Sequence, residues 1–162
     1  MDDVEYMKHF GVYGVSILDD RLLCIEKNSG PYQNRYDLPG GSQEPGEGLT
    51  ETLVREVKEE TGRTVLQYDQ PRIYDTFVHP VGRPTGTHHI FALYTITVSE
   101  TAEALIETVV DGLNDSNGAG WINLADLNME NASPLILKVI DEWQQNKAVL
   151  DKSSFEQWTI KK

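Results

Sequence analysis

One segment of this chain constrains its structure more than any other: a loop rich in Gly, Pro and Glu that leads directly into a strongly patterned helix. The loop covers residues 42–48. In residues 49–61, apolar side chains recur at helical spacing, and Gly62 follows as a typical C-terminal stop. The sequence therefore predicts a helix over 49–61 that buries an apolar stripe, formed by Leu49, Leu53, Val54 and Val57.

The same helix carries three carboxylates on a second stripe. Glu56, Glu59 and Glu60 are spaced i, i+3 and i+4, so they share about 100° of arc. Their mutual repulsion weakens an isolated helix, and a hard cation such as Mg²⁺, which takes oxygen ligands, would offset it. Arg55 lies on neither stripe and is predicted to fold back and pair with Glu47.

A run of Glu on a helix is most often only a solvated face, so the surrounding spacing has to decide. From Gly41 to Arg63 the sequence resembles the Nudix box, G-x5-E-x7-R-E-U-x-E-E-x-G-U, in which U is a bulky aliphatic residue. With about 7% usage per residue type, its seven fixed positions coincide by chance on the order of once in 10⁸ starts. One position departs from the pattern, because Arg63 occupies the last aliphatic place; the matching residues are Gly41, Glu47, Arg55, Glu56, Val57, Glu59, Glu60 and Gly62.

The resemblance implies an α/β fold, the Nudix-type α/β/α sandwich with a mixed β-sheet, and a metal-dependent hydrolase that cuts a diphosphate bond. By position in the box, the carboxylates of Glu56, Glu59 and Glu60 and the main-chain carbonyl of Gly40 would bind Mg²⁺, with Mn²⁺ as an alternative. Glu47 and Arg55 would orient the loop. The chemistry would be attack of water on one phosphorus, with the metal neutralising charge on the phosphate oxygens.

The sequence offers more than one candidate for the general base. Glu56 is the first choice. Many Nudix proteins place a further catalytic Glu shortly before a late strand, but here Gly118 occupies that place and Asp115 is the nearest acid. Glu44 in the loop is a further candidate for contact with a metal through water.

Substrate recognition rests on weaker patterns. Tyr32, Arg35 and Tyr36 lie just upstream of the box and are candidates for stacking on a base or pairing with a phosphate, although ordinary packing explains them too. Arg83 is a candidate contact for a terminal phosphate or ribose. Pro80 lies near the place where the resemblance associates a proline with ADP-ribose hydrolases, so the expected substrate is a nucleoside diphosphate linked to another moiety, with a lean to ADP-ribose or a similar nucleotide sugar.

The rest of the chain predicts strands and one further helix. We expect a hairpin of strands over 10–18 and 21–26, extended segments over 64–68, 72–79, 88–98 and 121–124, a short helix over 99–106 and turn-like structure over 111–120. A second amphipathic helix is predicted over 133–147, with Ser133 as its N-cap and Pro134 in its first turn. His79, His88 and His89 show no ligand spacing for zinc.

The length and net charge of the chain limit its domain organisation and its partners. The 162 residues suit a single Nudix domain over 1–147, with a tail over 148–162 whose aromatic residues predict packing on the domain or on a partner, which leaves a homodimer open. A net charge of −12 argues against nucleic-acid polymers and anionic membranes as partners. It does not exclude a small nucleotide substrate, because bound divalent metals can reverse the local sign of the charge. The single cysteine, Cys24, and the acidic N-terminus suggest a cytoplasmic protein.

Three other functions fit parts of the pattern. The first is a (d)NTP pyrophosphatase that acts on oxidised or noncanonical nucleotides. The second is a nucleotide-sensing Nudix domain without activity, although such domains often lose box carboxylates that this chain keeps. The third is a prenyl-diphosphate isomerase of the same fold, which would need Cys24 beside the diphosphate.

Overall fold

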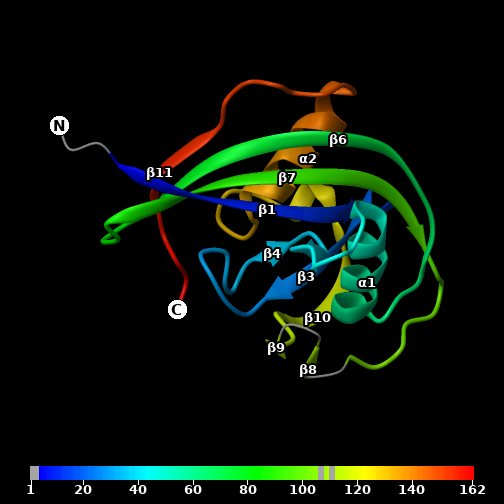
Figure 1. Cartoon of the computed structure of the whole chain (residues 1–162). Helices are drawn as coiled ribbons and strands as arrows, with labels where there is room; N and C mark the ends of the chain where they lie inside the picture. Colours follow the sequence, from blue (N-terminus) through cyan, green and yellow to red (C-terminus); the bar gives the residue numbers. More distant parts are fainter. Residues whose placement is uncertain (1–3, 106–107, 110–111) are drawn as a thin grey trace.

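The computed structural model describes residues 4–105, 108–109 and 112–162 (Figure 1). Its elements, in chain order, are β1 (Glu5–Val15), β2 (Ile17–Leu18), β3 (Arg21–Lys27), β4 (Tyr36–Asp37), β5 (Gly40–Gly41), α1 (Leu49–Thr61), β6 (Val65–Pro80), β7 (Thr85–Val98), β8 (Thr108–Val109), β9 (Gly112–Leu113), β10 (Ser116–Asn123), a 3-10 turn (Leu124–Asp126), α2 (Pro134–Gln145) and β11 (Ser154–Trp158).

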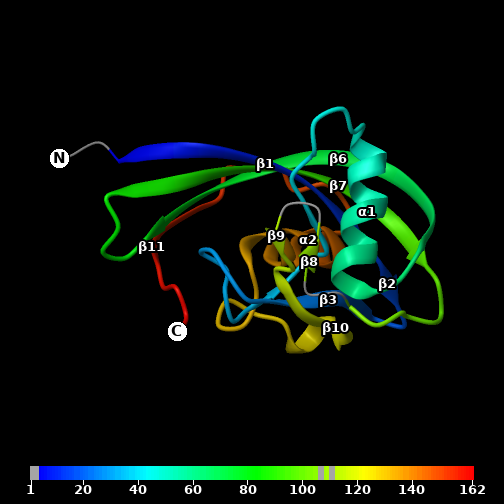
Figure 2. The same ribbon diagram turned by 60° about the horizontal axis from the view of Figure 1, so that its bottom comes forward.

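The main sheet is mixed, as predicted. Its five strands run in the order β11-β6-β7-β1-β5, with β1 parallel to β7 and β11 parallel to β6, whereas the pairs β6–β7 and β1–β5 are antiparallel. A smaller sheet has the order β10-β3-β2, and β4 pairs with β3. Figure 2 shows the long β6–β7 pair curving over the smaller sheet.

The two helices cover opposite faces of the main sheet. Along β1, Val12 points to a core cluster with Leu53 and Val57 of α1, whereas the adjacent Tyr13 points to a second cluster that includes Leu135 of α2. This alternation follows from the two-residue period of a strand. The result is the predicted α/β/α sandwich. No helix in the described part of the chain is long and apolar enough to cross a membrane.

Both helices begin where the sequence predicts. α1 covers residues 49–61 and ends at Gly62, whose φ of 74° is the left-handed conformation that glycine tolerates best. α2 is capped by Ser133, which accepts a hydrogen bond from the backbone N–H of Ile136, and it ends at Gln145, two residues before the predicted limit. Two residues predicted for the apolar stripe of α1, Leu49 and Val54, are 38% exposed and lie at its edge.

Three strand predictions were wrong in detail. Of the hairpin predicted over 10–18 and 21–26, only the short β2–β3 pair forms. The residues up to Val15 belong to β1, which pairs with β7 in the main sheet. The two extended segments before residue 80 are one strand, β6, with an irregularity between Asp69 and Arg72. Residues 116–120, predicted as a turn, begin strand β10, which pairs with β3; Asp111 lies outside the described residues.

The predicted short helix over 99–106 is also wrong. Residues 99–105 form no regular element, and Ile106 lies outside the described residues. Arg63, which replaces the usual aliphatic residue of the box, explains part of this. Its guanidinium donates hydrogen bonds of 2.8 Å to the carbonyls of Ser99 and Glu100. These two carbonyls therefore accept from a side chain and not from the backbone N–H groups of a helix.

Candidate active site

The loop before α1 is fixed to the helix by one ion pair. The Nε and Nη2 atoms of Arg55 donate to the two carboxylate oxygens of Glu47 at 2.7 and 2.9 Å, which is the pairing that the sequence predicts. The Glu47 carboxylate also accepts from the hydroxyl of Thr52, and Arg55 donates to the carbonyl of Ser42. Hydrogen bonding to Arg55 lowers the pKa of Glu47 to about 2, so this bidentate pair stays charged near neutral pH.

Glu56, Glu59 and Glu60 line one small cleft of about 100 Å³, with Gly40 and Gly41 on its opposite wall. We call this the carboxylate cleft. Glu56 and Glu60 are buried, and the Glu59 side chain is 11% exposed. The fold therefore brings together all four predicted metal-binding positions on α1 and β5.

Arg55 holds two of these carboxylates as well as Glu47. Its Nη1 atom lies 2.9 Å from Glu56 Oε1 and 3.2 Å from Glu59 Oε2. Because an arginine is a permanent cation with five donors in one plane, it can orient several carboxylates at once. It thus reduces the repulsion within the glutamate stripe.

Glu60 is held differently. Its Oε1 atom accepts a 2.7 Å hydrogen bond from the backbone N–H of Gly40. Burial raises the pKa of Glu60 well above its usual range, Glu56 raises it further, and Lys27 opposes the shift. A divalent cation in the cleft would favour the charged carboxylate, because a bound ion is the largest local charge in such a site.

The donor set fits a hard divalent cation. The oxygens are carboxylates and a main-chain carbonyl, which Mg²⁺ and Mn²⁺ prefer. Glycine is required opposite them, since a Cβ at Gly41 would lie 2.8 Å from Glu56 Oε1. Among the residues that the structure describes, no group of three His, Cys, Asp or Glu side chains is arranged so that it could hold a metal ion. Mg²⁺ needs none, because it usually keeps several waters and takes only one or two carboxylates.

Lys27 lines the cleft, and sequence reasoning missed it. It lies at the end of β3, and its ammonium is 3.3 Å from Asp115 Oδ2. Burial acts to lower the pKa of Lys27, but Glu60, Asp37 and Asp115 outweigh it, so the pKa is raised and the ammonium is charged. No motif marks this lysine; only the pairing of β3 with β10 brings it beside the box.

The two further acids have different positions. Asp115 lies at the rim of the cleft, where it accepts hydrogen bonds from Lys27 and from the hydroxyl of Ser29. Glu44 is not among the described residues that line the cleft. Its backbone N–H donates to Glu47 Oε1, so it supports the shape of the loop.

A second cavity, of about 300 Å³, adjoins the cleft, with which it shares Lys27, Asp115, His9 and Tyr13. We call it the aromatic cavity. Tyr32, one of the predicted substrate-binding residues, forms part of its wall. Sequence reasoning missed His9, because only the register of β1 shows which way its ring points.

His89 sits at the base of the aromatic cavity. Its Nε2 lies 2.9 Å from the hydroxyl of Tyr13 and its Nδ1 lies 3.0 Å from that of Tyr32. Burial lowers the pKa of His89 to about 3, and His9 and Lys27 add to the shift. The ring is therefore neutral, and a neutral imidazole satisfies both tyrosines by donating at one nitrogen and accepting at the other.

The other predicted substrate contacts lie away from the cleft. Arg35 is buried, donates to the carbonyls of Met129, Ala132 and Thr159, and lies 4.0 Å above the ring of Trp158. The guanidinium is thus used to join the tail to the domain, and we withdraw it as a phosphate contact. Tyr36 pairs through its backbone with residues 131–133. Arg83 lies in the turn between β6 and β7, beside the tail.

Comparison with known proteins agrees with this architecture. A sequence model of the NUDIX domain matches residues 7–143. A MutT NUDIX hydrolase from Burkholderia pseudomallei has a similar structure, with a TM-score of 0.66, 19% identity, and coverage of 83% of this chain and 97% of that one. The NUDIX domain of Shewanella oneidensis NrtR, solved with ADP-ribose, gives a TM-score of 0.64 at 18% identity, covering 86% and 88%.

Two curated relatives match over a shorter stretch. An ADP-ribose pyrophosphatase from Methanocaldococcus jannaschii is 43% identical over 51 residues, which is 32% of this chain and 30% of the relative. Nucleoside triphosphatase NudI from Salmonella schwarzengrund is also 43% identical, over 49 residues, or 30% and 35%. The chain therefore aligns with only about a third of the length of either relative.

With a family match over most of its length, the chain belongs to the NUDIX domain family. The predicted family and fold are confirmed. Nudix hydrolases generally use divalent metal ions. The two curated relatives are named as an ADP-ribose pyrophosphatase and a nucleoside triphosphatase.

Proposed function

We propose that this protein is a Mg²⁺-dependent hydrolase that cuts the diphosphate bond of a nucleoside diphosphate linked to another moiety. The observation that carries the proposal is the carboxylate cleft, in which Glu56, Glu59 and Glu60 of α1 face Gly40 and Gly41 of β5. Stripes of glutamate on exposed helices have no such wall opposite them. Mn²⁺ prefers the same oxygen ligands and is the expected substitute.

In this site the three glutamates and the carbonyl of Gly40 would hold the ion, with one or two of the carboxylates bound directly and the others through its waters. Bound there, it would neutralise charge on the diphosphate oxygens and make a coordinated water more acidic. Lys27 supplies a further positive charge at the other side of the cleft, where a phosphate oxygen would lie. Arg55 keeps Glu56 and Glu59 in position.

Glu56 is the proposed base that accepts the proton of the attacking water. It is buried, lines the cleft and is oriented by Arg55. Asp115 is the second candidate, because it lies at the cleft rim and takes the place of the usual loop glutamate. Glu56→Gln should lose activity in either case, because Glu56 also binds the ion, so Asp115→Asn separates the two: a loss of about 10² or more in kcat, a typical contribution of general base catalysis, would assign the base to Asp115, and near-wild-type turnover would leave Glu56.

The aromatic cavity is the proposed site for the nucleoside. Its 300 Å³ and its Tyr32 and His9 rings suit a base and ribose beside the cleft. An ADP-ribose pyrophosphatase among the relatives and the ADP-ribose bound to a similar NUDIX domain support ADP-ribose or a nucleotide sugar as the substrate class. The nucleoside triphosphatase relative favours the second candidate, a (d)NTP pyrophosphatase.

The test is product release from ADP-ribose, sugar nucleotides, dinucleoside polyphosphates and dNTPs, each with Mg²⁺ and with chelator. Metal-dependent cleavage of diphosphate-linked compounds supports the proposal, and cleavage of dNTPs alone selects the second candidate. Binding of nucleotide without any cleavage would identify a sensing domain instead.

A matched pair of helix variants tests the metal-binding stripe. Glu59→Gln should fold normally and lose most activity. Glu51→Gln, on the exposed side of the same helix, should keep it, because Gln can still accept the hydrogen bond that Glu51 takes from the N–H of Gly48. Wild-type turnover in Glu59→Gln would refute the assignment of the stripe as the metal site.

A further inference from the structure

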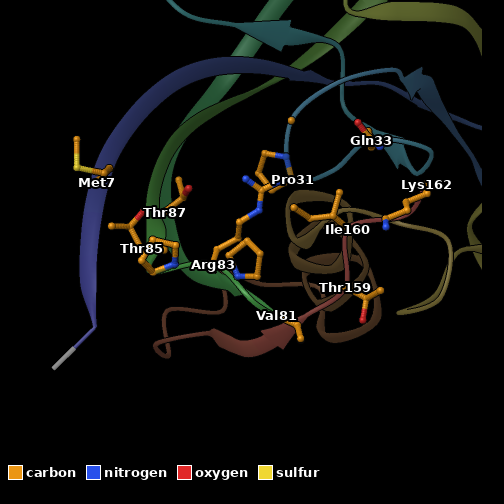
Figure 3. Close-up of a pocket in the computed structure, with 14 residues that line it drawn as sticks. Met7, Pro31, Gln33, Val81, Arg83, Thr85, Thr87, Thr159, Ile160 and Lys162 are labelled. Atoms are coloured by element: carbon orange, nitrogen blue, oxygen red, sulfur yellow. The ribbon is translucent and has the colours of Figure 1, made fainter. Parts of the chain in front are cut away.

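A large cavity lies at the far end of the sheet, outside the site described above. Its volume is about 840 Å³, within the range of sites for drug-sized ligands. Met7, Pro31, Val81 and Ile160 supply apolar surface, and Arg83 and Lys162 supply charge (Figure 3). We call it the tail cavity, because residues 159–162 form part of its wall.

The tail cavity is continuous with the proposed nucleotide site. It shares Met7, Pro31 and Thr87 with the aromatic cavity, which in turn shares Lys27 and Asp115 with the carboxylate cleft. The three spaces therefore form one groove along β1. A nucleoside in the aromatic cavity with its diphosphate in the cleft leaves the tail cavity for a group more remote from the scissile bond.

The charge of the tail cavity is opposite to that of the whole chain. The chain has a net charge of −12, yet among the described residues that line this cavity there is no Asp or Glu, while Arg83 and Lys162 are both cationic. Two cations in a wall whose described residues include no Asp or Glu, set beside apolar surface, suit an anionic group. A neutral sugar would gain nothing from them.

The cavity wall is rigidly built. The indole N–H of Trp158 donates to the carbonyl of Pro31 at 2.7 Å, and Gln33 donates to the carbonyl of Lys161 at 2.7 Å. Arg35 stacks on Trp158 and donates to the carbonyl of Thr159. These contacts join the tail to the loop that carries Tyr32, so both cavities depend on residues beyond the matched segment 7–143.

We propose that the tail cavity binds a phosphate carried by the substrate at a position remote from the scissile diphosphate, through Arg83 and Lys162. The preferred substrate is then a nucleoside diphosphate derivative with an additional phosphate on the sugar of its nucleoside, because the second sugar extends from the diphosphate away from the aromatic cavity. This inference rests on the proposed function of the carboxylate cleft.

The experiment compares ADP-ribose with its 2′-phosphate and its 1″-phosphate. For the wild type, kcat/KM should be about tenfold higher for the 2′-phosphate than for the other two compounds, a modest value for two exposed charge-assisted contacts. Arg83→Ala/Lys162→Ala should abolish this preference, so that kcat/KM for the 2′-phosphate falls to the value for ADP-ribose. Arg21→Ala/Lys147→Ala removes the same charge from exposed sites that line none of the three cavities, and should retain the preference.

A second pair of variants adds charge instead of removing it. Val81→Glu places a carboxylate in the exposed part of the cavity wall and should reverse the preference, whereas Leu150→Glu, at a still more exposed position outside the groove, should not. A wild type that treats all three compounds alike, or a double variant that still prefers the phosphate, overturns the inference.

Equilibrium binding keeps the inference separate from the proposed function. Calorimetry with chelator present measures the affinity for the same three compounds without turnover. If the enzyme cuts none of them, the proposed function fails, while tighter binding of the 2′-phosphate, lost in Arg83→Ala/Lys162→Ala, still supports the cavity. Equal affinities for all three overturn it whatever the activity.

Discussion

Adding a single methyl group at Gly41 should lower kcat strongly while it changes the stability of the fold only slightly. A Cβ there would lie 2.8 Å from Glu56 Oε1 and Cδ, and 2.9 Å from Oε2, so the carboxylate has to retreat by about 0.6 Å to reach an ordinary contact of 3.4 Å. The atoms in the way are the end of a flexible side chain, so stability should fall by less than about 1 kcal/mol. Since misplacing a reacting group by about 1 Å costs on the order of 10²-fold, Gly41→Ala should lower kcat by about 10- to 100-fold.

The assay is steady-state hydrolysis of the substrate found by the panel, with thermal unfolding in parallel. Gly120→Ala is the control, because its Cβ meets nothing closer than 3.9 Å and both properties should stay near the wild type. Gly40→Ala is the opposite case, since its Cβ would lie 2.1 Å from the Val12 carbonyl oxygen at a φ of 152°, and it should unfold the protein. Full activity in Gly41→Ala would refute the claim that the Glu56 carboxylate must occupy this position.

Two further predictions concern buried side chains. Burial raises the pKa of the Cys24 thiol far above its usual range, so a thiol reagent at pH 8 should label the protein only after unfolding. Labelling of the native protein with loss of activity would instead support a prenyl-diphosphate isomerase. Trp158→Ala should destabilise the protein by about 3 kcal/mol in denaturant unfolding, because the indole is 3% exposed and carries both the Pro31 hydrogen bond and the Arg35 stack; an unchanged midpoint would show that the tail contributes nothing.

The predictable part of the fold is the part with local signals. The bounds of α1 and α2 were predicted to within two residues, because the period of a helix and its capping residues, here Gly62 and Ser133, can be recognised in the sequence. The division of β1 and β2 between two sheets carries no such signal. Val15 and Ile17 are equally apolar, and only the long-range pairing of β1 with β7 decides where the chain changes sheet.

The same distinction applies to the candidate site, where local sequence spacing could be interpreted and long-range strand pairing could not. The arrangement of Glu47, Arg55 and the three carboxylates could be predicted because all lie within one box, in which spacing alone sets geometry. Lys27 and His9 were missed because strand pairing brings them to the cleft from distant parts of the chain. Arg35 was misassigned for the same reason, since nothing near it in sequence reveals that Trp158 covers it.

The neutral histidine of the aromatic cavity makes stability depend on pH in a definite direction. Burial lowers the pKa of His89 to about 3 in the folded protein, while the unfolded value is 6.5. The stability that this difference contributes is complete above pH 6.5 and is lost as the pH falls toward 3, because the unfolded chain binds a proton that the native state excludes. Between pH 7 and 5 this amounts to about 2 kcal/mol for one such group.

Glutamine can still donate to one of Tyr13 and Tyr32 and accept from the other, but it does not titrate. The stability of the wild type relative to His89→Gln should therefore fall by about that amount when urea unfolding is measured at pH 7 and again at pH 5. His9, whose pKa burial also lowers, titrates in both proteins and largely cancels in the comparison. A difference between the two proteins that does not change with pH would show that the pKa of His89 is the same in the folded and unfolded states, and would refute the claim that burial keeps the ring neutral at pH 5.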